Sequence, residues 1–136
     1  MTSQPGPGSG ASHIGVFDLK MLLERFRGKQ SIVVKLLTLF SEEAEEHRDA
    51  LLKALAGKNY PALRGPAHTV RGVALNICAA DLAAAAAQVE EAVVGQKYES
   101  LDEPIARLVA EINRTVAATP SGIDFVNNCR PAVKAA

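Results

Sequence analysis

Apolar residues repeat every three or four positions along most of this chain, which is the spacing of one face of an α-helix. The pattern predicts helices over about residues 17–27, 29–56, 60–79, 82–94 and 102–118. The predicted inward positions are Phe17, Met21, Leu22 and Phe26, then Val33, Leu37, Phe40, Ala44, His47, Leu51 and Leu55, then Leu63, Ala67, Val70, Ala74 and Ile77, then Leu82, Ala86, Val89 and Val93, and finally Ile105, Leu108, Ile112 and Val116.

Residues that stop or cap helices separate these segments. Asn59 and Asp81 are predicted to cap the helices that follow them. Short connections make consecutive helices antiparallel. We therefore expect an all-α fold, an antiparallel up-and-down four-helix bundle with a short additional N-terminal helix across one end. The predicted stop signals are Gly28, Gly57, Gly95 and the pair Thr119-Pro120.

The two ends of the chain differ from its middle. Residues 1–15 are rich in glycine, proline and serine and predict a flexible N-terminal segment. Residues 16–119 are expected to form one bundle domain. Residues 120–136 form a C-terminal tail without a clear period, and its Ile123, Phe125 and Val126 allow either packing on the bundle or a disordered end.

Composition narrows the classes of function. Fifteen basic and fifteen acidic residues cancel, so no overall field favours nucleic acid or an anionic membrane. The longest apolar run, Leu82 to Ala87, is far shorter than the roughly 20 residues that span a bilayer. We expect no secretory signal, because the first residues show no basic stretch followed by an apolar one. We expect a cytoplasmic monomer in which Cys78 and Cys129 are free thiols.

His68 is the main candidate for chemistry. On a helix it lies away from the apolar stripe, so its imidazole is expected to face solvent. Arg64, Arg71, Gly72 and Leu75 fall on the same arc, at i−4, i+3, i+4 and i+7. Glycine inside a helix costs about 0.5–1 kcal/mol relative to alanine, and close approach by a partner would explain it.

The other candidate residues have plainer explanations. His47 lies on an apolar seam and is expected to be a core or boundary residue. Cys78 lies ten residues beyond His68, which on one helix is about 15 Å away, too far for a thiol–imidazole pair. The acidic residues are interpreted as solvated helix faces rather than as catalytic or metal-binding pairs; they are Glu42, Glu43, Glu45, Glu46, Glu90 and Glu91.

The stretch His68-Thr69-Val70-Arg71-Gly72, closed by Asn76-Ile77-Cys78-Ala79, resembles the signature of the histidine-containing phosphotransfer (HPt) family. That signature is a histidine, two residues, a lysine and a glycine. Here Arg71 replaces the usual lysine and keeps its charge, while Cys78 stands where the family often has glycine. The residues from Phe17 to Thr119 follow the helical layout of the family around this stretch.

The resemblance implies a phosphocarrier of multistep phosphorelays rather than an enzyme. His68 would accept a phosphoryl group from one response-regulator receiver domain and donate it to another, with a hybrid histidine kinase as a candidate partner. Arg71 and Arg64 would stabilise the phosphoryl group, and Gly72 and Leu75 would contact the receiver. No cofactor or metal of its own is expected, because the receiver domain would supply Mg²⁺.

Two alternatives share the predicted fold. A helical-bundle adaptor would bind partners without phosphoryl chemistry, and the presence of His68 argues against it. A kinase substrate domain of the chemotaxis type would carry the same histidine within a longer chain.

Pro66 predicts a kink or break in the helix that carries His68, because proline cannot donate to the carbonyl four residues before it. Two consequences are open. The helix could restart at Pro66 and place His68 in a new first turn, where unpaired amides favour a phosphoryl group, or it could bend mildly without any electrostatic effect.

Overall fold

The structure is a computed structural model that describes residues 15–129. It contains α2 (Leu19–Arg25), α3 (Gln30–Ala56), α4 (Arg64–Asn76), α5 (Ala80–Val94) and α6 (Asp102–Asn128), with 3₁₀ turns η1 (Tyr60–Leu63) and η2 (Tyr98–Ser100). No strand occurs in this range, which confirms the predicted all-α class. The segment 1–14, predicted to be flexible, and the end of the tail, 130–136, lie outside the described residues.

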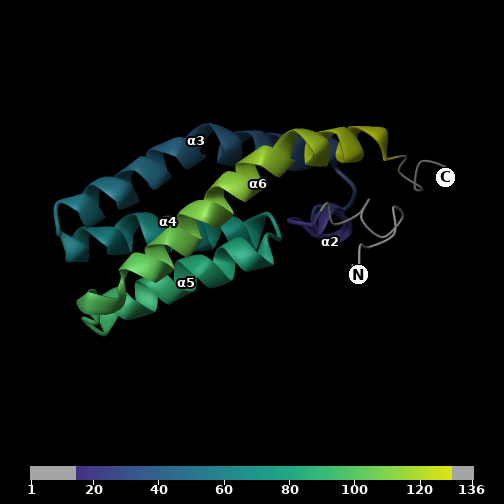
Figure 1. The fold of residues 1–136 in the computed structure, drawn as a ribbon. Helices are drawn as coiled ribbons and strands as arrows, with labels where there is room; N and C mark the ends of the chain where they lie inside the picture. Colours follow the sequence, from purple (N-terminus) through teal and green to yellow (C-terminus); the bar gives the residue numbers. More distant parts are fainter. Residues whose placement is uncertain (1–14, 130–136) are drawn as a thin grey trace, which may run out of the picture.

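The helices α3, α4, α5 and α6 run in alternating directions and form the bundle, as predicted (Figure 1). The short helix α2 lies at one end of the bundle, near the C-terminal half of α6 (Figure 1). Asp18 begins α2, because its carboxylate accepts a hydrogen bond from the Met21 amide. The bundle therefore presents α4 and α5 along one side and closes one end with α2.

The core follows the predicted apolar seams closely. The stripe of α4 is buried from Leu63 through Ile77, with Val70 only 1% exposed. Met21 is an error of the prediction, since its side chain is 47% exposed and Leu19 is buried in its place. Leu19 and Leu22, three residues apart, form the buried face of α2, and Met21 lies off this face.

The predicted end of the last helix at Thr119-Pro120 is wrong, because α6 continues through Pro120 to Asn128. Packing offsets the cost of this internal proline: Val126 is fully buried, and the amide group of Gln30 donates to the carbonyl oxygen of Val126. Gly122 also brings the helix against Phe17, whose ring carbons lie 3.4 Å from where a Cβ would be. The first part of the predicted tail therefore belongs to the bundle.

Several predicted caps are also wrong. Neither Asn59 nor Asp81 caps a helix with its side chain; Asn59 precedes η1, and Asp81 lies in the first turn of α5. Gly57 and Gly95 do follow the last helical residues of α3 and α5, but with negative φ. The left-handed conformation falls on the next residue in each case, at Lys58 and Gln96.

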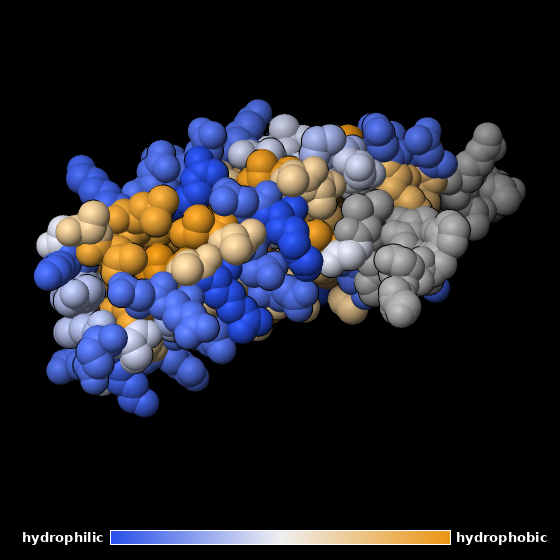
Figure 2. All heavy atoms as spheres, viewed as in Figure 1, coloured by the Kyte–Doolittle hydropathy of each residue, from blue (hydrophilic) through white to orange (hydrophobic). Residues whose placement is uncertain are grey.

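The surface between α3 and α6 is noticeably apolar toward the end where α3 finishes (Figure 2). Leu52 of α3 is among the exposed large apolar side chains, at 44%. Within residues 15–129, no helix combines the length and the apolar character needed to cross a membrane.

Candidate functional site

His68 lies in the middle of α4 and points away from the core, as the sequence predicted. Its neighbours Ala67 and Val70 are buried on the apolar stripe, whereas 67% of the His68 side chain is exposed. The stripe fixes the rotation of α4, so the imidazole is held at the surface beside α5.

Glu90 of α5 is the main contact of this histidine. Its Oε2 lies 2.7 Å from His68 Nδ1, and its Oε1 accepts a hydrogen bond of 2.8 Å from Arg71 Nη1. Each carboxylate oxygen thus has one partner from α4. Glu90 is only 7% exposed, so this contact joins a surface histidine to a buried carboxylate.

The carboxylate of Glu90 is held in its ionised form. Burial alone would raise the pKa of Glu90, but the hydrogen bonds from His68 and Arg71, together with their charges, outweigh burial and hold the pKa below its ordinary value. An ionised carboxylate can only accept hydrogen bonds, so His68 must donate through Nδ1–H. In the neutral imidazole this leaves the lone pair on Nε2, the nitrogen that is not bound to Glu90.

Glu90 corrects the sequence interpretation, which placed it with Glu91 on a solvated face. Glu91 is exposed, but Glu90 is buried against α4. The available signal was spacing, since Ala83, Ala86, Glu90 and Val93 repeat at three, four and three residues along the buried side of α5. An acidic residue on such a stripe requires a partner, and that partner is far away in sequence.

The two arginines expected to flank the phosphoryl group have different surroundings. Arg71 is half-buried and bound to Glu90. Arg64 is exposed, and it forms no ion pair within residues 15–129. The structure therefore brings His68 and Arg71 together through Glu90 and leaves Arg64 at the surface one turn before the histidine.

The surface beside His68 is open. A Cβ added to Gly72 would meet nothing within 4 Å, and the same holds for Gly65 on the preceding turn. Leu75, one turn beyond Gly72, is 55% exposed. The fold itself would tolerate side chains at both glycines. Because glycine has no side chain, the surface next to the imidazole stays free.

Leu75 also borders a shallow apolar hollow of about 230 Å³ between α2 and the end of α4, which Met21 lines as well. The two exposed apolar side chains therefore share one surface. Arg25 of α2 fixes this arrangement, because its guanidinium donates to the carbonyl oxygens of Leu75 and Asn76 at 2.9 and 3.2 Å. These are carbonyls that the end of a helix leaves without intrahelical partners.

Cys78 ends α4 in the left-handed conformation, with φ of 58°. The Ala79 amide donates to Ala74 and the Cys78 amide to Leu75, the pair of bonds that closes a helix with a left-handed residue. Glycine suits this position better than cysteine. Burial raises the pKa of the Cys78 thiol, opposed by Arg25 and assisted by Asp18, so the thiol stays protonated near neutral pH.

The helix does restart in the region expected from Pro66, but it restarts at Arg64 rather than at Pro66 itself. The α-helix begins at Arg64, after the 3₁₀ turn η1, so Pro66 lies within its first turn, where a missing N–H costs little. His68 is the fifth helical residue, and its amide falls beyond the unpaired positions of a helix start. The proposed first-turn phosphoryl site is therefore wrong.

The other histidine candidate lies away from this site. His47 is half-buried at the boundary between α3 and α4, as predicted.

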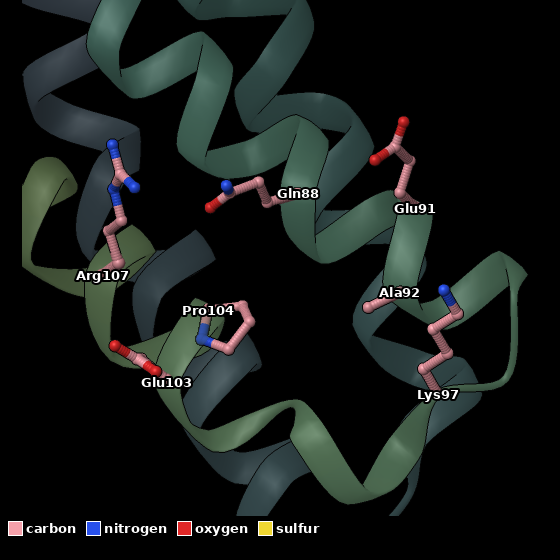
Figure 3. A pocket seen from close by; sticks show the side chains of 7 residues that line it. All are labelled: Gln88, Glu91, Ala92, Lys97, Glu103, Pro104 and Arg107. Atoms are coloured by element: carbon pink, nitrogen blue, oxygen red, sulfur yellow. The ribbon is translucent and has the colours of Figure 1, made fainter.

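A cavity of about 440 Å³ lies between the end of α5 and the start of α6 and includes none of the site residues (Figure 3). Its walls combine Glu91 and Glu103 with Lys97 and Arg107, a mixture that favours no one ligand charge. No cluster of three or more possible metal ligands occurs in residues 15–129.

Together, the fold and the site define a class: a helical bundle that presents a surface histidine whose Nδ1 is hydrogen-bonded to a buried carboxylate. Comparison with protein families assigns residues 35–119 to the Hpt domain. The chain belongs to this family, which confirms the resemblance drawn from the sequence. No curated protein and no solved structure matches the chain.

Proposed function

We propose that this protein is a phosphorelay intermediate that carries a phosphoryl group on His68 between the aspartates of receiver domains. Membership of the Hpt domain family implies histidine phosphotransfer in two-component signalling. The observation that points to His68 is the hydrogen bond between its Nδ1 and buried Glu90, which leaves the lone pair of Nε2 available on a side chain that is 67% exposed.

The contact with Glu90 suits His68 for nucleophilic attack. With its proton held on Nδ1, the imidazole uses the Nε2 lone pair to attack the phosphorus of an aspartyl phosphate. The Nε2–P bond forms as the P–O bond to the aspartate breaks, and the aspartate leaves as a carboxylate. The ring then bears positive charge, which the nearby Glu90 carboxylate offsets. The reverse reaction passes the group to a second aspartate.

The receiver domain would supply Mg²⁺ and align the reacting atoms, so this chain acts as a phosphocarrier rather than as an enzyme. The open surface at Gly72, with Leu75 and Met21 beyond it, provides room and apolar contact for docking. We expect the protein to act as a monomer in the cytoplasm. An adaptor without phosphoryl chemistry would have no use for a histidine held by a buried carboxylate.

The direct test uses a phosphorylated receiver domain with Mg²⁺. Incubation should give a phosphohistidine on the protein that is labile in acid and stable in base, and His68→Gln should abolish it while circular dichroism shows unchanged helix content. His47→Gln serves as the matched control and should transfer normally. Label that persists in His68→Gln, or that is lost only in His47→Gln, would overturn the assignment.

Docking can be tested at Gly72. Gly72→Leu should leave the fold intact, because no atom lies within 4 Å of the new Cβ, and leucine has the higher helix propensity. Its side chain would nevertheless occupy the space beside His68 and should reduce receiver transfer by tenfold or more, on the order of 1.4 kcal/mol. Ala110→Leu, at an exposed position of α6, is the control for adding leucine to a helix. Native transfer by Gly72→Leu would remove this surface from the docking site.

A further inference from the structure

The two arginines near His68 sit in different environments, although the sequence suggested one shared role. We propose that Arg71 is a positioning residue that acts through Glu90, and that Arg64 is the cation available to the phosphoryl oxygens. This assignment rests on the proposed phosphocarrier function and specifies how its site is divided.

Arg71 is placed to orient Glu90. The carboxylate has two oxygens, and the structure gives one to Arg71 Nη1 at 2.8 Å and the other to His68 Nδ1 at 2.7 Å. A free glutamate side chain samples several rotamers, and the bond to Arg71 limits this freedom. Arg71 thus keeps Oε2 directed at the imidazole, and its effect on His68 passes through the carboxylate.

The charge of Arg71 is therefore largely neutralised by Glu90. One guanidinium and one carboxylate cancel within the Arg71–Glu90 pair. A phosphoryl group arriving at Nε2 brings negative charge that this pair does not balance. A second cation is required nearby, and it should be free of competing carboxylates.

Arg64 meets this requirement. It lies at i−4 from His68 on the same helix, a spacing that places Cβ atoms about 5–6 Å apart. Its side chain is exposed and makes no ion pair within residues 15–129. The long side chain can extend along α4 toward the exposed edge of the imidazole, where Nε2 lies.

The two roles predict different behaviour in combined variants. If Arg71 acts through Glu90, its removal should have little further effect once Glu90 can no longer serve both donors. Glu90→Gln creates this situation, because an amide offers one acceptor oxygen where the carboxylate offers two. The effects of Arg71→Ala and Glu90→Gln should then be strongly non-additive, whereas Arg64→Ala should add to either.

Chemical phosphorylation with phosphoramidate tests this without a receiver domain. Nε2 attacks the phosphorus, the P–N bond of phosphoramidate breaks, and ammonia leaves. Arg71→Ala and Glu90→Gln should each slow the reaction by roughly tenfold, and the double variant should be no slower than Glu90→Gln alone. Arg64→Ala should slow each of these backgrounds by a similar further factor. Arg64→Lys should restore most of the rate, and Arg107→Ala, which changes an exposed arginine near the start of α6, should not change it.

The ¹⁵N shifts of the His68 ring provide a readout that a loss of stability would not mimic. In the folded, unphosphorylated protein, Arg71→Ala and Glu90→Gln should move the ring away from the Nδ1–H tautomer, while Arg64→Ala should leave it unchanged. Unchanged shifts in Arg71→Ala, or an equal loss of rate from Arg71→Ala with and without Glu90→Gln, would overturn the positioning role.

Different results would overturn the role of Arg64, the role of Arg71 and the proposed function. An unchanged phosphoramidate rate in Arg64→Ala would overturn the role of Arg64, while receiver transfer to His68 could still proceed. Absence of phosphohistidine in the parent protein would overturn both the proposed function and the Arg64 assignment, and the ring shifts would still decide the role of Arg71.

Discussion

Two polar contacts between helices, each made by an arginine, differ in what they bury. Arg71 of α4 reaches Glu90 of α5, a carboxylate that is 7% exposed and that also binds His68. Arg48 of α3 reaches the exposed Asn113 of α6 at 2.7 Å. Arg48 also lies 3.5 Å from an oxygen of Glu45, a side chain that is 75% exposed.

The two contacts differ in their energetic cost to the fold. An exposed contact such as Arg48–Asn113 contributes about 0–1 kcal/mol and costs little to form. A buried carboxylate requires that both its oxygens be bonded, and apolar packing would often be at least as stable. Glu90 occupies a position on α5 where alanine or valine would suffice for packing. Its placement is therefore explained by His68 rather than by stability.

The largest expected difference lies between Glu90 and its neighbour Glu91. Glu90→Ala should reduce receiver transfer to His68 by about 10–100-fold, because Nδ1–H loses a bond to a charged acceptor worth about 1.5–3 kcal/mol. Glu91→Ala changes an exposed residue one position along and should transfer at the parent rate. Quenched-flow experiments measure the transfer rates of both variants. Similar rates would contradict a role of the Glu90 contact in transfer.

On the α3/α6 side, we expect substitutions to alter stability without altering transfer. Pro120 lies inside α6, where it removes a backbone hydrogen bond that costs up to about 3 kcal/mol. Pro120→Ala should raise the free energy of unfolding by about 1–3 kcal/mol in urea titration, with an unchanged transfer rate. A slower transfer in this variant would show that the α6 side communicates with His68.

Acid should weaken the α4/α5 contact. The folded pKa of Glu90 is lowered, so the ionised carboxylate stabilises the fold above the unfolded value near 4.5, and this contribution is lost as the pH falls through the lower, folded pKa. The difference in unfolding free energy between the parent and Glu90→Gln should therefore shrink as the pH falls below about 4.5. A difference that grows in acid would contradict the ionised state.

The smallest expected change concerns the turn that joins α4 to α5. Cys78→Gly should raise the unfolding free energy by about 0.5–1 kcal/mol, because glycine adopts the left-handed conformation without strain. Transfer should be unaffected. Lys58→Gly, at the left-handed residue after α3, is the matched variant and should give a similar gain. Destabilisation by Cys78→Gly would show that the thiol makes a packing contribution larger than the strain.

The parts of the fold that the sequence predicts are those governed by local periodicity. Val70, Ala74 and Ile77 are buried as expected, and this rotation of α4 places His68 at the surface. The predicted helix end at Pro120 is wrong because local rules exclude proline from helix interiors, whereas the packing of Val126 and Gly122 extends α6 past it. Long-range packing outweighs the local rule there.

The site is predictable only in part for the same reason. Arg64, His68, Arg71, Gly72 and Leu75 share an arc because they belong to one helix. Glu90 comes from another helix, and sequence alone gives no distance between them. Its place on a buried stripe of small residues marks it as unusual, and only the packing of α4 on α5 shows that His68 and Arg71 are its partners.

The most direct test is to identify the ring nitrogen of His68 that carries the phosphoryl group. The protein should be phosphorylated by a receiver domain and studied by ¹H–¹⁵N and ³¹P NMR of the histidine ring. The Glu90 contact predicts phosphorus bonded to Nε2, with a proton retained on Nδ1 and donated to Glu90. Phosphorus on Nδ1, which would require the contact with Glu90 to break, would contradict the account.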